Sequence, residues 1–234
     1  MTIGSVLNEA LEYYRKAWRH YTGVSAALFL VIGVLAAVAQ EGRGSNSVVA
    51  EIGLNVVFTV AMIVGSSWLH AAVVISSEEQ RHGRSFPEPA VLWEAVRPTM
   101  FRVLSAATIA ALVLYFLSAL LSVIALPLIV FLMTRWPLIT PTVVLEDMPL
   151  KSVFRRCHTM AKGKFFDLML LALLSVIILS VLTLAGLAAF AFLPAFGQMW
   201  LATAAVGVLG VPPVLLMWTT VYFQLNRLQP PLPA

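Results

Sequence analysis

Long uncharged runs alternate with short charged stretches along the whole chain. No Asp, Glu, Lys or Arg occurs in 21–40, 52–77, 103–134 or 168–226. A helix needs about 20 apolar residues to cross the hydrocarbon core of a bilayer. Each run is long enough for at least one crossing, so the pattern predicts an all-α, polytopic transmembrane helical bundle.

The runs divide into six predicted spans. Pro194 and Gly197 mark a turn between the last two spans, because these residue types end helices. The middle run could instead hold one long span and a re-entrant piece. Two spans there place 13 of the 15 Lys and Arg residues on one side, as the cytoplasmic enrichment of basic residues favours. The six predicted spans lie at about 22–39, 52–76, 103–122, 126–145, 168–191 and 201–224. We therefore expect one integral domain over 1–234 in the cell membrane, with both termini cytoplasmic.

Amphipathic segments precede the first, third and fifth spans, at about 5–20, 89–97 and 148–162. Their apolar side chains recur at the spacing of one helical face, and the middle segment is expected to end at Pro98. Such helices are expected to lie in the membrane interface, with apolar residues toward acyl chains and basic residues toward anionic headgroups. Docking of a protein partner is the alternative. The candidate contacts are Arg15, Lys16, Arg19, Lys151, Arg155, Arg156, Lys162 and Lys164.

The order of these segments suggests a repeat of three units, each an amphipathic helix followed by a transmembrane hairpin. Residues 6–10 (Val-Leu-Asn-Glu-Ala) align with residues 91–95 (Val-Leu-Trp-Glu-Ala) in this scheme. Duplication and divergence of one ancestral unit would explain the order.

Composition agrees with a membrane protein and argues against a separate soluble domain. Charged residues make up 11% of the chain, against about 25% in soluble domains, and mean hydropathy is +0.92. The net charge of +4 belongs to basic residues that flank spans, so a nucleic-acid partner is not expected. The single cysteine, Cys157, excludes a disulfide within the chain.

Arg135 is the one basic residue predicted to lie inside the membrane. If Glu146 marks the interface, a straight helix places Arg135 about 16 Å deeper, where an unpaired charge is costly. Pro137 and Pro141 interrupt the same span and free the carbonyls of Met133 and Pro137. The segment is a candidate lipid or anion site, or a structural kink in which Arg135 satisfies the freed carbonyls. Its residues are Arg135, Trp136, Pro137 and Pro141.

The same segment carries a family resemblance. Residues 135–138 (Arg-Trp-Pro-Leu), 141–146 (Pro-Thr-Val-Val-Leu-Glu) and 162–166 (Lys-Gly-Lys-Phe-Phe) resemble the membrane domain of some bacterial glycerophosphoryl diester phosphodiesterases. Related stand-alone six-span proteins of unassigned function share the pattern. The resemblance implies a six-span module without catalysis, because the phosphodiesterase reaction belongs to a separate barrel of about 250 residues.

No pattern of catalytic, cofactor-binding or metal-ligating residues occurs in the sequence. The four histidines lack paired-ligand spacing, and no Walker A, G-x-S-x-G or Rossmann motif is present. We therefore expect a non-catalytic scaffold, regulator or partner subunit that engages anionic lipid, another membrane protein or a second copy. The alternative is a transporter or lipid-handling protein with its substrate path at Arg135 and the broken fourth span. An intramembrane enzyme is a weaker third hypothesis.

Overall fold

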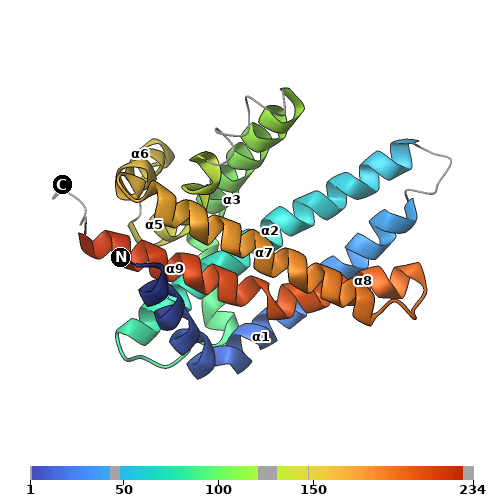
Figure 1. The fold of residues 1–234 in the computed structure, drawn as a ribbon, viewed down its shortest axis with the longest axis horizontal. Helices are drawn as coiled ribbons and strands as arrows, with labels where there is room; N and C mark the ends of the chain where they lie inside the picture. The colour runs from blue at the N-terminus through green and yellow to red at the C-terminus, as the bar shows by residue number, and fades with distance from the viewer. Residues whose placement is uncertain (1, 43–47, 121–130, 147, 229–234) are drawn as a thin grey trace.

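The structure is a computed structural model that describes residues 2–42, 48–120, 131–146 and 148–228 (Figure 1). Every regular element in this part of the chain is helical, which confirms the predicted all-α fold. The elements are α1 (Ile3–Gly42), α2 (Val48–Arg81), α3 (Pro89–Leu120), the 3-10 helix η1 (Trp136–Leu138), α5 (Ile139–Glu146), α6 (Leu150–Ala161), α7 (Phe165–Ala189), α8 (Ala195–Leu209) and α9 (Val211–Leu228).

Five helical stretches of the described chain are long and apolar enough to cross a membrane. They are Ile3–Gly42, Val49–Arg81, Pro89–Val113, Phe165–Ala189 and Ala195–Leu228. The chain is therefore a membrane protein. The last stretch combines α8 and α9, which join at Gly210 just before Pro212.

The predicted fourth span, 126–145, in which Pro137 and Pro141 were expected to interrupt the helix, is not continuous in its described part. Residues 131–133 are helical, a turn follows at 134–135, and η1 then leads into α5. Pro137 lies inside η1 and has no backbone N–H to donate, which explains why regular α-helix begins only at Ile139. The first part of the predicted span, with the turn expected near 122–127, lies outside the described residues.

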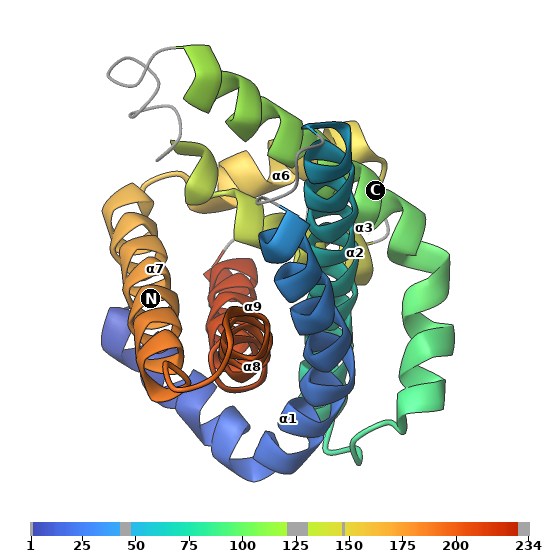
Figure 2. The same ribbon diagram turned by 90° about the vertical axis from the view of Figure 1, so that its right-hand side faces the viewer.

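Two of the amphipathic segments were predicted to be separate from the spans that follow them, and both predictions are wrong, because each segment and its span form one helix. The segments 5–20 and 22–39 belong to one helix, α1, which bends in its middle (Figure 2). Segment 89–97 likewise continues through Pro98 into α3. Pro98 and Glu94 are both exposed, so the one backbone bond lost at this proline lies on the outer side of the helix.

Three inner helices, α2, α5 and α9, contact one another, and three outer helices cover their junctions. The first outer helix, α1, contacts α2 and α9, while α3 contacts α2 and α5, and α6 contacts α5 and α9. Each outer helix thus bridges a different inner pair. This is the arrangement expected of three hairpin units around a common axis, although the repeat itself stays a prediction.

Burial within the outer helices corrects the register of that repeat. Each amphipathic segment includes a pair of buried side chains four residues apart, and the pairs are Val6 and Ala10, Leu92 and Val96, and Val153 and Cys157. Val6 therefore corresponds to Leu92, one residue beyond the sequence alignment. Val91, which the alignment matched to Val6, is 56% exposed.

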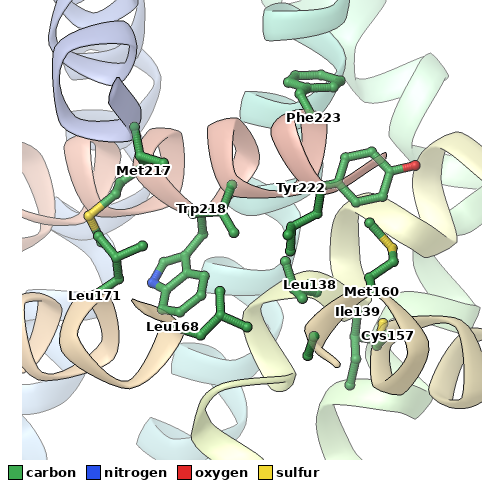
Figure 3. Packing of buried hydrophobic residues seen from close by; sticks show 14 of the residues in the cluster. Leu138, Ile139, Cys157, Met160, Leu168, Leu171, Met217, Trp218, Tyr222 and Phe223 are labelled. Carbon is green, nitrogen blue, oxygen red and sulfur yellow. The ribbon is translucent and has the colours of Figure 1, made fainter. Parts of the chain in front are cut away.

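The buried faces of these segments pack on the protein, which corrects their expected contact with acyl chains. In α6, Val153, Cys157 and Met160 join a core cluster with Leu138 of η1 and Tyr222 of α9 (Figure 3). α6 covers residues 150–161 of the predicted segment 148–162, and Gly163 follows its end with a φ of +78° that favours glycine. Asp is a residue type that caps helix N-termini, and Asp147, shortly before α6, lies outside the described residues.

Small residues let α1 and α8 approach closely. A Cβ on Gly33 would lie 2.7 Å from the carbonyl oxygen of Trp200, and one on Gly207 would overlap the ring of Phe29. Trp200 also donates its indole N–H to the carbonyl of Leu30 at 3.1 Å. Close backbone approach at glycine is a common way for membrane helices to gain van der Waals contact.

Candidate functional site at the charged end

The inner helices end together around a pocket of about 500 Å³. We call this end of the bundle, which holds His82, Glu146 and Arg227, the charged end. The start of α1, the end of α9 and the helix α6 lie there, whereas the turn between α7 and α8 lies at the opposite end (Figure 1). The pocket is lined by Glu78, Arg81, His82, Leu145, Glu146, Met148, Tyr222, Phe223, Asn226 and Arg227. We refer to it as the axial pocket.

A buried ion pair forms one wall of the axial pocket. Arg156 donates from Nε to Glu146 Oε2 at 3.2 Å, and the two side chains are only 11% and 6% exposed. Tyr222 donates its hydroxyl proton to Glu146 Oε1 at 2.9 Å. Arg156 also donates from Nη2 to the side-chain oxygen of Asn226 at 2.6 Å. The network joins α5, α6 and α9 through charge-assisted bonds, which are stronger than neutral ones.

A second network attaches the first turns of α1 to the same end. Gln224 donates to Glu9 at 2.9 Å, and the guanidinium of Arg81 lies 3.5 Å from the same carboxylate. The guanidinium carbon of Arg81 also lies 4.0 Å from the ring centroid of Phe223, a cation–π distance. This wall therefore combines α1, α2 and α9.

Cys157 lies on the buried face of α6. Its sulfur is 3.5 Å from the hydroxyl of Thr142, and the side chain is 2% exposed. Burial raises the pKa of the thiol to about 11, because a thiolate would lose its hydration there. The residue therefore packs as a neutral thiol and is not a nucleophile at neutral pH.

Seven of the eight basic residues predicted to contact lipid or a partner lie at the surface. Lys164 is partly exposed, and the exposed ones are Arg15, Lys16, Arg19, Lys151, Arg155 and Lys162. Arg156 is the exception, because its guanidinium turns inward to Glu146. Its assignment as a surface contact is therefore wrong.

Arg135 lies beside α6, so the straight-helix estimate of its depth does not apply. It lines a cavity of about 230 Å³ together with Phe154, Cys157 and His158 of α6. Arg135 donates from Nη1 to the carbonyl of Phe131 at 2.8 Å and to the hydroxyl of Thr134 at 2.9 Å. The expected bonds to the carbonyls of Met133 and Pro137 are therefore replaced by one to Phe131.

The other residues of the predicted Arg135 site do not converge on one group. Trp136 lines the Arg135 cavity and also a second cavity of about 260 Å³, which Pro137 shares with Ser175 and Trp218. Pro141 is buried in α5. The structure thus brings Arg135 and Trp136 together and assigns the two prolines to the helix break and to core packing.

The ion pair of Glu146 and Arg156 was missed by the sequence reasoning, although one signal was available. Tyr222 and Asn226 are polar residues four apart at the end of an apolar run, which places them on one helical face. Their partners come from two other segments of the chain, and only the tertiary fold supplies that pairing.

Within the described residues, no group of three or more His, Cys, Asp or Glu side chains is placed to hold a metal ion. Comparison of the chain with family models, with curated proteins and with solved structures finds no match. The resemblance to the membrane domain of the phosphodiesterases therefore stays an expectation.

Proposed function

We propose that this protein is a non-catalytic membrane scaffold or partner subunit, and that the axial pocket receives a polar segment of a partner protein. The observation that carries the proposal is the pocket itself, since three inner helices bring charged side chains to one cavity of about 500 Å³. Side chains of both signs line it, namely Glu78 and Glu146, and Arg81 and Arg227. A protein segment with mixed charges is the ligand class that such a lining complements.

The walls of the axial pocket are held rigidly, which supports binding. Glu146 is fixed by Arg156 and Tyr222, while Arg81 rests on Phe223 beside Glu9. A preorganised site loses less conformational entropy when its partner binds. Glu78, whose carboxylate lies 3.7 Å from the ring of His82 on the same helix, and Arg227 are the charged groups of the lining that a partner would meet.

The exposed basic residues support a position against anionic lipid. Lys151 and Arg155 lie on the outer side of α6, and Arg15 and Lys16 on the outer side of α1. Basic residues next to membrane spans favour the cytoplasmic side and attract anionic headgroups. We propose that the charged end, with both termini, is cytoplasmic and that the protein resides in the cell membrane.

Site-specific photo-crosslinking tests the partner proposal. A photoreactive amino acid at Arg227 should give a defined adduct in intact cells, and the same group at Phe192, which is 81% exposed at the opposite end, should not. Glu78→Lys reverses one charge of the pocket and should reduce the Arg227 adduct at least several-fold. The matched control is Glu94→Lys, since Glu94 is exposed on α3 and does not line the pocket.

The proposal fails if the Arg227 adduct survives Glu78→Lys unchanged, or if Phe192 captures the same partner. An adduct of twice the 25.5 kDa chain mass would identify the partner as a second copy. Transport or lipid handling is the second candidate function, because Arg135 lines a cavity of its own.

A further inference from the structure

The Arg135 cavity contains a cation whose hydrogen-bonding capacity is only partly used. The Nη1 atom bonds to Phe131 and Thr134, whereas Nε is buried and has no hydrogen-bond partner among the described residues. The guanidinium carbon lies 3.4 Å from the ring centroid of Phe131. This cation–π contact holds the guanidinium in place, but the positive charge still has no counter-ion among the described residues.

No carboxylate pairs with Arg135 in the described part of the chain. Glu146, the acid at the end of α5, pairs with Arg156 and Tyr222 instead. The neighbouring segment 121–130 contains no acidic residue in its sequence. A partly buried charge without a counter-ion is unfavourable, so an anion from outside the chain would stabilise this site.

His158 places a second hydrogen-bonding side chain at the same cavity. Its ring centroid lies 6.0 Å from that of Phe131, the ring that the Arg135 guanidinium also contacts. Both Arg135 and His158 line the cavity, and His158 is exposed on α6. Guanidinium and imidazole N–H groups are both suitable donors to the oxygens of a phosphate.

The remaining lining indicates what the anion is attached to. Ile109 and Val113 of α3, together with Leu132 and Ile139, surround the polar groups with aliphatic side chains. At about 30 Å³ per water molecule, the 230 Å³ cavity has room for a phosphate group and several methylene groups. A free phosphate ion would leave these aliphatic walls without a complementary partner.

We propose that Arg135 and His158 bind the phosphate of a membrane phospholipid, whose chain passes between α3 and the 131–139 segment. The broken fourth span is what makes the site, because the turn at 134–135 and η1 bring Arg135 beside α6. This site is separate from the axial pocket, whose lining shares no residue with it. The lipid proposal therefore goes beyond the proposed function, and either one can fail without the other.

Native mass spectrometry of the purified full chain tests the site directly. The protein, delipidated in detergent, is titrated with phosphatidylglycerol and in a second arm with inorganic phosphate. The wild type should bind one phosphatidylglycerol tightly, and Arg135→Gln should weaken that binding at least tenfold. His158→Gln should weaken it several-fold, and because His158 is on the surface this change leaves folding intact. Arg97→Gln is the matched control, an exposed cation on α3 that does not line the cavity, and should change binding less than twofold.

Ile109→Trp tests the chain-binding half of the site without changing any charge. It fills the cavity from α3 and should reduce lipid binding, while thermal unfolding reports whether the protein stays folded. Equal lipid binding by the wild type, Arg135→Gln and His158→Gln would overturn the proposal. So would competition of millimolar inorganic phosphate with the lipid, because the site would then bind a free anion.

Discussion

At the residue scale, the buried carboxylate of Glu146 depends on two partners from other helices. Its side chain is 6% exposed, and its two oxygens accept from Arg156 and Tyr222. Burial of both partners makes the pair costly to desolvate, but removal of only one partner leaves an uncompensated charge in the interior. The pair therefore matters more for what happens when it is broken than for its net contribution to stability.

Arg156→Gln should lower the free energy of unfolding by about 3–5 kcal/mol, because Glu146 would remain buried without its cation. The double variant Glu146→Gln/Arg156→Gln should recover part of that loss. Thermal unfolding in detergent measures both. Arg155→Gln, one residue earlier and exposed, should leave the free energy of unfolding unchanged. An equal loss of stability in Arg155→Gln and Arg156→Gln would contradict a specific role for the ion pair.

Cys157 allows a second test at this scale. Its pKa of about 11 means that the thiol is protonated at neutral pH, and that the thiolate fraction rises only as pH approaches 11. Maleimide should label it at least about 100-fold more slowly at pH 7.5 than an exposed cysteine at Thr159→Cys, because both burial and protonation suppress the reaction. Rapid labelling of the folded wild type would show that α6 does not pack as described.

At the element scale, amphipathic helices were predictable and their partners were not. The 3.6-residue periodicity of segment 148–162 predicts α6 and its buried residues Val153, Cys157 and Met160. Lipid and protein core are both apolar, however, so periodicity cannot say which of them covers that face. The sequence also could not predict that α3 continues through Pro98, because this depends on whether the lost hydrogen bond lies on the exposed side of the helix.

Close packing of α1 and α8 leads to a prediction at this scale. Gly207→Ala should lower the melting temperature, because the added methyl group overlaps the ring of Phe29 and forces the helices apart. Gly23→Ala is the matched control in α1, where a Cβ meets no atom within 4 Å. That change should be neutral or slightly stabilising, since alanine is the better helix former. Equal unfolding temperatures for both variants would contradict the close approach.

At the scale of the whole molecule, the charged end and the turn between α7 and α8 lie at opposite ends of the bundle (Figure 1). Thirteen of the 15 Lys and Arg residues were assigned to one side from sequence, and the axial pocket shows that the ends of α2, α5 and α9 meet on that side. The orientation of this end relative to the cell is the part that needs an experiment.

Cysteine accessibility tests that orientation. In a Cys157→Ala background, Phe192→Cys should react with an impermeant maleimide in intact cells. Ser85→Cys, exposed in the loop between α2 and α3, should react only after permeabilisation, because the charged end is cytoplasmic in our proposal. The reverse labelling pattern would overturn the orientation and leave the fold unaffected.

The sequence by itself determined that this is an all-helical membrane protein with one polar end. Hydrophobic runs and clustered charges suffice for that conclusion, because the cost of burying charge in a bilayer depends on composition and spacing. Tertiary structure alone decided that Arg156 turns inward to Glu146, that the interrupted fourth span lies beside α6, and that Arg135 shares a cavity with His158. These features depend on which distant segments meet. The periodicity of one helix predicts its apolar face, but it does not specify which other segment packs there.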